Sequence, residues 1–356
     1  MTLRFGLYAE LQTPLAKSHA ELYREIMRQM EHADQVGFDV YSIIEHHFFQ
    51  EFSISANPLA LICAVAQKTR RLRFRVALHT LPLANPMRLA GEIAAADIFT
   101  NGRLETGLGR GHAWLFERSG VELAESRERF DEAVEILLHA WTENSFSHQG
   151  RYYKFKDLSV VPKPLQRPHP PLYTGGTSLA TYEMAGARGW GMFLPPLLPY
   201  KVMEPSINAY LVASHKAGHK PNIVYIRPVY LGDDPRQIEA EIKPYLHNFL
   251  AFNASPVKGL PPKEELIAKG FGFYASGALE SLTRLSYRDI VEQEIGFIGT
   301  PDQVISQIRR LREQAPITEL AIVANFGGIE HWQAIKTQEL FARHVMPAFQ
   351  QERSLP

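Results

Sequence analysis

The chain of 356 residues contains a single cysteine, Cys63, and no excess of charge of either sign. One thiol cannot form an internal disulfide framework or a metal site built from several thiolates, and it suits a reducing compartment. Lys plus Arg and Asp plus Glu number 38 each, so no net field attracts a polyanion. A disulfide-stabilised protein and a nucleic-acid partner are therefore not expected.

Long apolar runs are also missing. The sequence has no stretch of about eighteen apolar residues, the length that a transmembrane helix needs. Residues 1–10 lack the basic segment and long apolar segment of a secretory signal. The sequence predicts a soluble, cytoplasmic protein with no membrane partner. Hydrophobic residues still make up 45% of the chain, which is enough for one large α/β core or for two ordinary domains.

Short apolar runs alternate with amphipathic segments along most of the chain. Residues 3–8 form an apolar run, and after Ser18 apolar residues recur at three- and four-residue steps until Gly37, as in a strand followed by a helix. Repetition of this unit predicts parallel strands that close into a (β/α)8 TIM-type barrel, a single domain over residues 1–350. The predicted strands are residues 3–8, 38–44, 72–81, 104–108, 171–174, 191–194, 223–231 and 319–324.

Two segments interrupt the alternation. Five prolines between residues 162 and 171 forbid a regular helix, so residues 146–171 are predicted to form a hairpin and an extended stretch. Residues 252–296 lack a clean period and are predicted to be a lid-like insertion with short helices. The alternative fold, two Rossmann-like halves, needs Gly-x-Gly-x-x-Gly after a strand, and residues 107–111 place the third glycine wrongly. The barrel is favoured.

The site of a barrel of this kind lies at the carboxyl ends of its strands, so polar residues after each predicted strand are the candidates. Imidazoles, one guanidinium and a glycine-rich turn are expected to meet at this end. The candidates are Glu45, His46, His47, His79, Thr80, Asn85, Arg110, His112, Thr174, Gly175, Gly176, Thr177, Ser178, Asn325, Gly327 and Gly328.

The turn at residues 174–178 lies between a predicted strand and a predicted helix. Its glycines permit close approach of the backbone, and the first-turn N–H groups with two hydroxyls suit an anion such as phosphate. A plain N-cap would have the same composition. Arg110, at a neighbouring strand end, is either a clamp on the same anion or part of a surface salt bridge.

His46 is the candidate for a general acid or base, because the ordinary pKa of imidazole lies near working pH. A buried structural histidine is the alternative. Adjacent residues on an extended chain point in opposite directions, so residues 45–47 make a poor metal site, and no metal is predicted. Cys63 falls among apolar neighbours in a predicted helix, and no Gly-x-Ser-x-Gly motif occurs, so nucleophilic catalysis is not favoured.

Four motifs, in order along the chain, resemble those of bacterial luciferase and its flavin-dependent relatives. Residues 44–48 read Ile-Glu-His-His-Phe, residues 81–88 Leu-Pro-Leu-Ala-Asn-Pro-Met-Arg, residues 107–111 Gly-Leu-Gly-Arg-Gly, and residues 299–301 Gly-Thr-Pro. The resemblance runs from residue 3 to about residue 347 and is weakest over the insertion. The chain is thus similar to the luciferase-like monooxygenases.

This resemblance implies a homodimeric barrel that takes reduced FMN from a separate NAD(P)H-dependent flavin reductase. The protein would use dioxygen to oxygenate a small organic substrate, of aldehyde, alkane, sulfonate or aromatic type. The resemblance also implies site roles. Arg110 with Thr177 and Ser178, in the turn that holds Gly175 and Gly176, would bind the FMN phosphate. His46 would be the catalytic histidine. Ala77 and Leu78 would lie against the isoalloxazine, where the family often has a cis peptide.

The sequence departs from the light-emitting subunit of luciferase at two places. Residues 175–178 stand where that subunit has Glu-Ser-Ala, and Gly109 stands where it has a cysteine, so bioluminescence is not expected. The aromatic residues of the insertion, Phe271, Phe273, Tyr274 and Tyr287, either line an apolar cavity or only pack the insertion. Two alternative functions remain open: hydride transfer with a deazaflavin cofactor, and flavin binding without catalysis.

Overall fold

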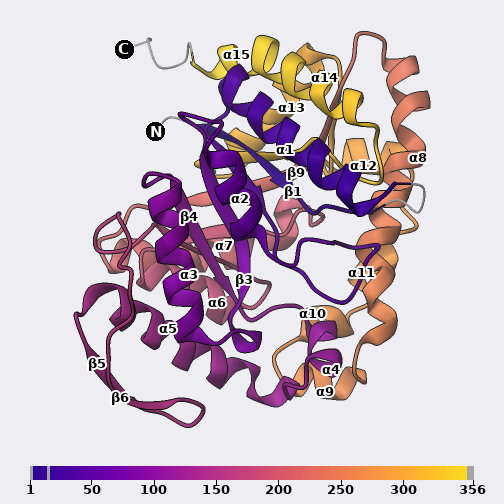
Figure 1. Cartoon of the computed structure of the whole chain (residues 1–356). Helices are drawn as coiled ribbons and strands as arrows, with labels where there is room; N and C mark the ends of the chain where they lie inside the picture. The colour runs from indigo at the N-terminus through magenta and orange to yellow at the C-terminus, as the bar shows by residue number, and fades with distance from the viewer. Residues whose placement is uncertain (1–2, 14–16, 351–356) are drawn as a thin grey trace.

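The computed structural model describes residues 3–13 and 17–350, and its centre is a closed ring of parallel strands (Figure 1). Neighbouring strands pair in the order β9, β11, β1, β2, β3, β4, β7, β8, and β8 pairs with β9 to close the ring. The predicted (β/α)8 barrel is confirmed, and two Rossmann-like halves are excluded. The strands of the ring are β1 Arg4–Ala9, β2 Val40–Ile43, β3 Arg73–Thr80, β4 Leu104–Gly109, β7 Leu172–Gly175, β8 Gly191–Leu194, β9 Ile223–Leu231 and β11 Glu319–Val323.

Helices connect the strands and surround the ring. The first, α1, begins after Ser18, whose Oγ accepts a hydrogen bond from the Glu21 amide, and ends at Gly37 with φ +101°. The others are α2 Pro58–Ala66, α3 Pro86–Phe99, α5 Ser126–Thr142, α6 Leu179–Ala187, α7 Tyr200–Lys216, α8 Pro235–Ala254, α13 Pro301–Gln314 and α14 His331–Leu340, which continues through a π-helical turn at Phe341–Val345 into α15 Met346–Gln350. In the described part of the chain, no helix is long and apolar enough to cross a bilayer.

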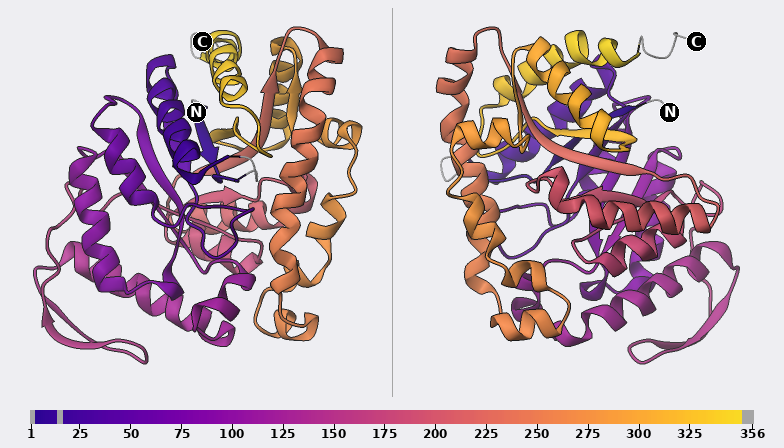
Figure 2. Two further views of the ribbon diagram at one scale, coloured as in Figure 1. Left: turned by 45° about the vertical axis from the view of Figure 1, so that its right-hand side comes forward. Right: turned by 180° about the vertical axis from the view of Figure 1, so that it is seen from behind.

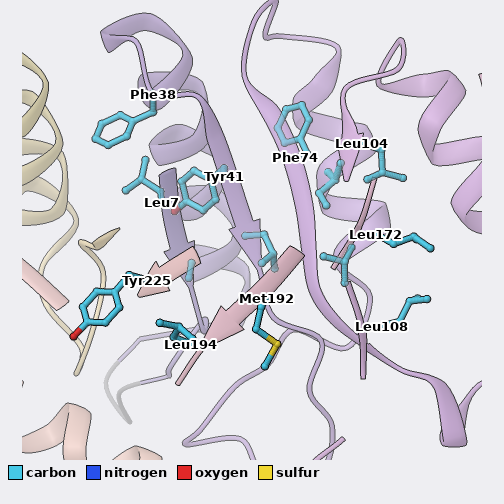
Figure 3. Packing of buried hydrophobic residues seen from close by; sticks show 14 of the residues in the cluster. Leu7, Phe38, Tyr41, Phe74, Leu104, Leu108, Leu172, Met192, Leu194 and Tyr225 are labelled. Atoms are coloured by element: carbon cyan, nitrogen blue, oxygen red, sulfur yellow. The ribbon is translucent and has the colours of Figure 1, made fainter. Parts of the chain in front are cut away.

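Side chains of the ring strands alternate between two apolar clusters. On β8, Met192 and Leu194 belong to the cluster between strands and helices, whereas Phe193 belongs to the cluster inside the ring. Figure 3 shows the outer cluster, in which Phe74, Leu104 and Leu172 come from three neighbouring strands. This alternation determines which side chains of each strand point into the ring and which point toward the helices.

Two segments interrupt the alternation of strands and helices. β5 Phe146–Gln149 and β6 Lys154–Leu158 make an antiparallel hairpin that projects from the body of the molecule (Figure 1), and residues 159–171 contain no helix or strand. After α8 the chain forms only short helices: Ser255–Gly259, α9 Lys263–Ala268, α10 Gly272–Ala275, α11 Ala278–Leu282 and α12 Tyr287–Glu292.

The sequence missed one strand, β10 Phe297–Gly299, which pairs with the last residues of β9. Three residues are too few to display a period, so only the partner strand reveals this one. β10 lies outside the ring because β9 pairs with its two ring neighbours, β8 and β11, through its earlier part, Ile223 to Pro228.

The insertion lies beside a short segment that follows β4. That segment contains a 3-10 turn at Ala113–Leu115 and α4 Phe116–Ser119. Leu266 and Phe271 of the insertion form one apolar cluster with Ala113 and Phe116. Figure 2 shows these two parts of the chain side by side, although about 150 residues separate them in sequence. The contact places the insertion next to the carboxyl end of β4.

Candidate functional site

A cavity of about 250 Å³ opens at the carboxyl ends of the ring strands. Residues in or directly after β1, β2, β3, β4, β7 and β8 contribute to its wall, together with α5, α8 and the insertion. The structure thus brings together every side chain predicted to bind the cofactor. These cavity-lining residues are Ala77, Leu78, Arg110, Gly175, Gly176, Thr177 and Ser178.

The amino terminus of α6 lies at this cavity and lacks the usual cap. Ser178 occupies the N-cap position, but its side chain makes no capping hydrogen bond, and its Oγ lies 2.8 Å from Thr181 Oγ1. By contrast, Asn85 at the start of α3 accepts hydrogen bonds from two first-turn amides. Of the first-turn N–H groups of α6, that of Thr181 donates to the Ser178 carbonyl at 2.9 Å. The N–H groups of Leu179 and Ala180 are left for an anion in the cavity.

Two arginines line the cavity, and within the described residues neither forms an ion pair, although the carboxylate of Asp131 acts electrostatically on both. Arg110 donates from Nη2 to Ser126 Oγ at 2.8 Å and to the Lys269 carbonyl at 3.0 Å, and its guanidinium lies 4.1 Å from the ring centre of Phe271. Its buried Nε has no hydrogen-bond partner within residues 3–13 and 17–350. Burial, and then the charge of Arg127, lower the pKa of Arg110 to about 10.

Arg127, the second of these residues, was missed from the sequence. It lies in the first turn of α5 and lines the cavity, because α5 begins just beyond the carboxyl end of β4. The rule that selects polar residues after strands cannot find a side chain on a helix. Together the two guanidiniums and the start of α6 make one region of the cavity strongly suited to an anion.

The wall at Ala77 and Leu78 is apolar and irregular. Their peptide bond is cis, and the pairing of β3 with β4 shifts register there. A Cβ added to Gly109 would lie 2.8 Å from Leu78 Cδ1, and one added to Gly107 would lie 2.6 Å from Leu78 Cδ2. Glycine at both positions lets Leu78 lie flat against β4 at the cavity wall.

His46 is buried against Phe52 and Trp114 and is not among the residues that line the cavity. Only 1% of it is exposed, its ring packs 4.4 Å from that of Phe52, and its Nε2 accepts a hydrogen bond from the Trp114 indole at 3.0 Å. Burial, and then the nearby His112 and His47, lower its pKa to about 2. His46 is therefore neutral, with its proton on Nδ1, and its catalytic role stays a prediction.

Trp114, which lines the cavity, links His46 to the insertion. The ring of His112 stacks on the indole at 4.4 Å and 5°, and Tyr274 of α10 makes a 2.8 Å hydrogen bond to His112 Nδ1. Burial lowers the pKa of His112 to about 4, so this imidazole is also neutral near pH 7. Of the four aromatic residues singled out in the insertion, Phe271, Phe273 and Tyr274 line the cavity and Tyr287 does not.

Glu45 also lines the cavity, and its carboxylate is fully engaged. Its Oε2 lies 2.7 Å from His79 Nδ1, and its Oε1 lies 3.2 Å from His47 Nε2 and 3.3 Å from the Thr80 amide. Burial acts to raise its pKa, but the hydrogen bonds with His47 and His79 outweigh burial and lower it to about 2. No group of three His, Cys, Asp or Glu side chains within the described ranges has the arrangement of a metal site.

The remaining candidates lie outside the cavity wall. Asn85 caps α3, Asn325 donates to Gln29, and the Gly327 amide donates to Gln12. Each of these polar groups supports the fold by a hydrogen bond at the end of an element. Of the residues predicted from the strand ends, Glu45, Thr80, His112 and Thr174 line the cavity in addition to the cofactor candidates.

The sequence missed a further cavity residue, Glu10, which directly follows β1. Its side chain is almost fully buried, and its Oε2 accepts hydrogen bonds from Gln12 Nε2 at 2.9 Å and from Asn253 Nδ2 at 3.2 Å. Burial raises its pKa to about 7, although both hydrogen bonds oppose the shift. Glu10 is a polar residue directly after a strand, so it carries the same sequence signal as the candidates at the other strand ends.

Comparison with known proteins agrees with this architecture. The family model described as luciferase-like monooxygenase matches residues 3–319, so the chain belongs to that family. Over 331 residues the chain is 29% identical to the FMNH(2)-dependent dimethylsulfone monooxygenase of Pseudomonas putida, covering 88% of this chain and 85% of that one. Over 256 residues it is 27% identical to the oxygenase component of the flavin-dependent trigonelline monooxygenase of Acinetobacter baylyi, covering 69% and 71%.

Solved structures share the barrel. Monooxygenase RslO1 from Streptomyces bottropensis superposes with a TM-score of 0.82 at 26% identity, covering 98% of this chain and 100% of that one. The oxygenating constituent of 3,6-diketocamphane monooxygenase of Pseudomonas putida, solved with FMN, gives 0.79 at 19% identity, covering 98% and 99%. An F420-dependent secondary alcohol dehydrogenase gives 0.74 at 17% identity, covering 98% and 99%. The last two likenesses concern the fold alone.

Proposed function

We propose that the protein is a flavin-dependent monooxygenase that uses reduced FMN and dioxygen to oxygenate a small organic substrate. The observation that carries this proposal is the cavity itself, because two guanidiniums that form no ion pair within the described residues line it together with an uncapped helix start and an apolar wall. A phosphorylated flavin matches both parts, because its phosphate is a dianion and its ring system is flat and largely apolar. The names of the curated relatives support the same reaction class.

Each predicted cofactor residue has a place in this proposal. Arg110 and Arg127, with the hydroxyls of Thr177 and Ser178 and the backbone at Gly175 and Gly176, would hold the phosphate. The flat wall made by Ala77 and Leu78 would support the isoalloxazine. When bound, reduced FMN supplies the electrons that activate dioxygen. The protein must position the substrate beside it and exclude water, and the apolar side chains of the insertion serve that purpose.

His46 is proposed to be the residue that moves a proton during the reaction. In this structure the His46 Nε2 accepts a hydrogen bond from the Trp114 indole, so the proton of the neutral imidazole is on Nδ1. For Nε2 to accept a proton from a group in the cavity, Trp114 must release that hydrogen bond. Because Tyr274 and His112 pack on the indole, a movement of the insertion is the natural way to release it.

The partners follow from the same chemistry. The sequence lacks a complete dinucleotide fingerprint, so a separate NAD(P)H-dependent flavin reductase is proposed to supply reduced FMN, in the cytoplasm. A relative named as an oxygenase component supports this division of labour. A homodimer is also proposed. Light scattering during size-exclusion chromatography would give twice the chain mass, and a monomer mass would contradict it.

Anaerobic titration tests the cofactor directly. Protein is mixed with reduced FMN, with reduced riboflavin and with a reduced deazaflavin, and each bound fraction is measured after rapid ultrafiltration. We expect FMN to bind best, because only FMN combines the phosphate with the flavin ring. Preferential binding of the deazaflavin would replace this proposal with hydride transfer. Tight FMN binding without oxygen transfer to any substrate of the four types would favour a non-catalytic flavin protein.

A further inference from the structure

Glu10 and the turn at Ser178 lie on opposite sides of the barrel mouth. In the closed order β9, β11, β1, β2, β3, β4, β7, β8, strands β1 and β7 are four places apart and so face each other across the ring. Glu10 follows β1, whereas Ser178 follows β7 and Arg110 follows β4. The anionic side chain is therefore remote from the region that the proposed function gives to phosphate.

The carboxyl group of Glu10 is buried without a counter-charge. Only 2% of the residue is exposed, and both hydrogen bonds from the protein reach the same oxygen, Oε2. Within the described residues no side chain donates to Oε1, and none forms an ion pair with the carboxylate. Glu45 is a contrasting acid in the same cavity, because two histidines engage both of its oxygens. Glu10 alone keeps an oxygen for a ligand.

Aromatic side chains line the cavity that Glu10 also lines, and Tyr8 is close enough to Glu10 for the two to interact electrostatically. Tyr8, Phe52, Trp114 and Tyr274 line the cavity together with Glu10. A carboxylate among aromatic faces is the arrangement that recognises organic cations, because both the charge and the ring quadrupoles attract a positive centre. A neutral apolar ligand would leave the carboxylate buried and unpaired, which costs free energy.

We propose that Glu10 is the specificity-determining residue of a substrate subsite, where its free carboxylate oxygen pairs with the cationic nitrogen of a small organic substrate. This proposal rests on the proposed function, since it assumes that the substrate binds beside a flavin held at the opposite side. The proposal excludes neutral aldehydes and alkanes as substrates and restricts the substrate class to molecules that carry a positively charged nitrogen. Gln12 and Asn253 are positioning residues that hold the carboxylate toward the cavity.

The protonation state of Glu10 makes the proposal testable by pH. Burial raises its pKa to about 7, so the carboxyl is mostly neutral at pH 5.5 and mostly charged at pH 8. Three other groups at the cavity do not change their protonation state between pH 5.5 and pH 8. The pKa of His112 is lowered to about 4 and that of Glu45 to about 2, whereas that of Arg110 is lowered only to about 10. Burial raises the pKa of Tyr8 and Tyr274 away from this range. Arg127 is the remaining cation of the wall.

The experiment compares choline, a permanent cation, with 3,3-dimethylbutan-1-ol, its neutral isostere. Binding of each to the FMN-loaded protein is measured by calorimetry at pH 8 and pH 5.5. We expect at least a tenfold preference for choline at pH 8 that falls to less than threefold at pH 5.5. Glu10→Gln should abolish the preference at both pH values, whereas Glu264→Gln, on the exposed surface of α9, should leave it unchanged.

Several outcomes would overturn the subsite. Equal binding of the two probes by the wild-type protein, binding of neither, or a preference that survives Glu10→Gln would each do so. FMN affinity is measured on the same samples. Retained FMN binding without cation preference rejects the subsite alone, whereas loss of FMN binding rejects the proposed function. The wild-type pH comparison keeps the test decisive if Glu10→Gln does not fold.

Discussion

Two buried arginines in the barrel, Arg75 and Arg110, have opposite surroundings. Arg75 lies in the early part of β3, and its guanidinium donates to both oxygens of Glu319 at 2.7 and 2.8 Å and to Glu105 Oε2 at 2.7 Å. It also lies 4.0 Å from the ring centre of Tyr173. Arg110, at the other end of the barrel, contacts a hydroxyl, a carbonyl and a phenyl ring, and it forms no ion pair within the described residues.

The difference separates charges that build the fold from charges that are kept for a ligand. Arg75, Glu105 and Glu319 are all buried and satisfy one another, as a buried ionic group must if the chain is to fold alone. Arg110 leaves one buried N–H without a partner and has no carboxylate, and Glu10 leaves an oxygen free. Incomplete pairing at the carboxyl ends of the strands is thus the physical signature of the site.

Removing the paired arginine should have the largest effect, and it should fall on stability. Arg75→Met removes the fully buried partner of two buried carboxylates and leaves them only the partly exposed Arg4 in common, so unfolding in urea should show a loss of about 3–5 kcal/mol. Burial acts to raise the pKa of Glu105, but Arg75, Arg4 and Arg73 together hold it low, so the variant should recover part of its stability as pH falls. The control is Arg73→Met, because Arg73 also pairs with Glu105 but is 31% exposed, and it should cost about 1 kcal/mol or less. Similar losses of stability in the two variants would contradict the expected difference between a buried and a partly exposed arginine.

Removing the unpaired arginine should change ligand binding and leave stability nearly unaltered. Arg110→Ala should weaken FMN by about 10- to 100-fold, as expected for the loss of a charge-assisted contact to phosphate. Riboflavin has no phosphate, so its affinity should change little. Flavin fluorescence quenching measures both. An equal loss for the two flavins would mean that the guanidinium does not contact the phosphate.

His46 and Glu10 should make the free energy of unfolding change with pH in opposite directions. His46 has a folded pKa of about 2, so below pH 6.5 only the unfolded chain takes up its proton, and stability falls by about 1 kcal/mol between pH 7 and 5.5. Glu10 has a folded pKa of about 7, so the folded chain takes up the proton first, and stability rises by about 1.5 kcal/mol over the same range.

Urea unfolding of two variants at both pH values separates these slopes. His46→Gln should lose less stability on acidification than the wild type, and Glu10→Gln should lose more. Differences of the same sign would show that one of the two groups is solvated in the folded protein. Neither variant removes an ion pair, so the pH dependence of its stability should differ from that of Arg75→Met.

The sequence predicted the barrel because its evidence is local and repeated many times. The apolar runs, the cap at Ser18 and the glycine at Gly37 each depend on neighbours within a few residues. β10 shows the limit of this evidence, since three residues have no period and take their structure from the end of β9. The sequence predicted that the insertion contains short helices but not where each begins and ends, because these bounds depend on packing against the segment after β4.

The site was predicted in part for the same reason. Arg110 and Ser178 were selected because strand ends of a parallel barrel meet at one face, and they do line one cavity. Arg127 gave no such signal, because a helix start reaches the cavity only through the path of the chain after β4. The position of His46 behind Trp114 was equally hidden, since the hydrogen bond joins residues 68 apart in sequence.

The order of apolar and polar residues along the chain by itself determined the ring of strands and helices and the residues that stand at the strand ends, because periodicity and capping act over a few residues. Only the tertiary structure decided which of those residues keep a free donor or acceptor. Whether a guanidinium finds a carboxylate, or an imidazole an indole, depends on side chains that come from distant parts of the chain.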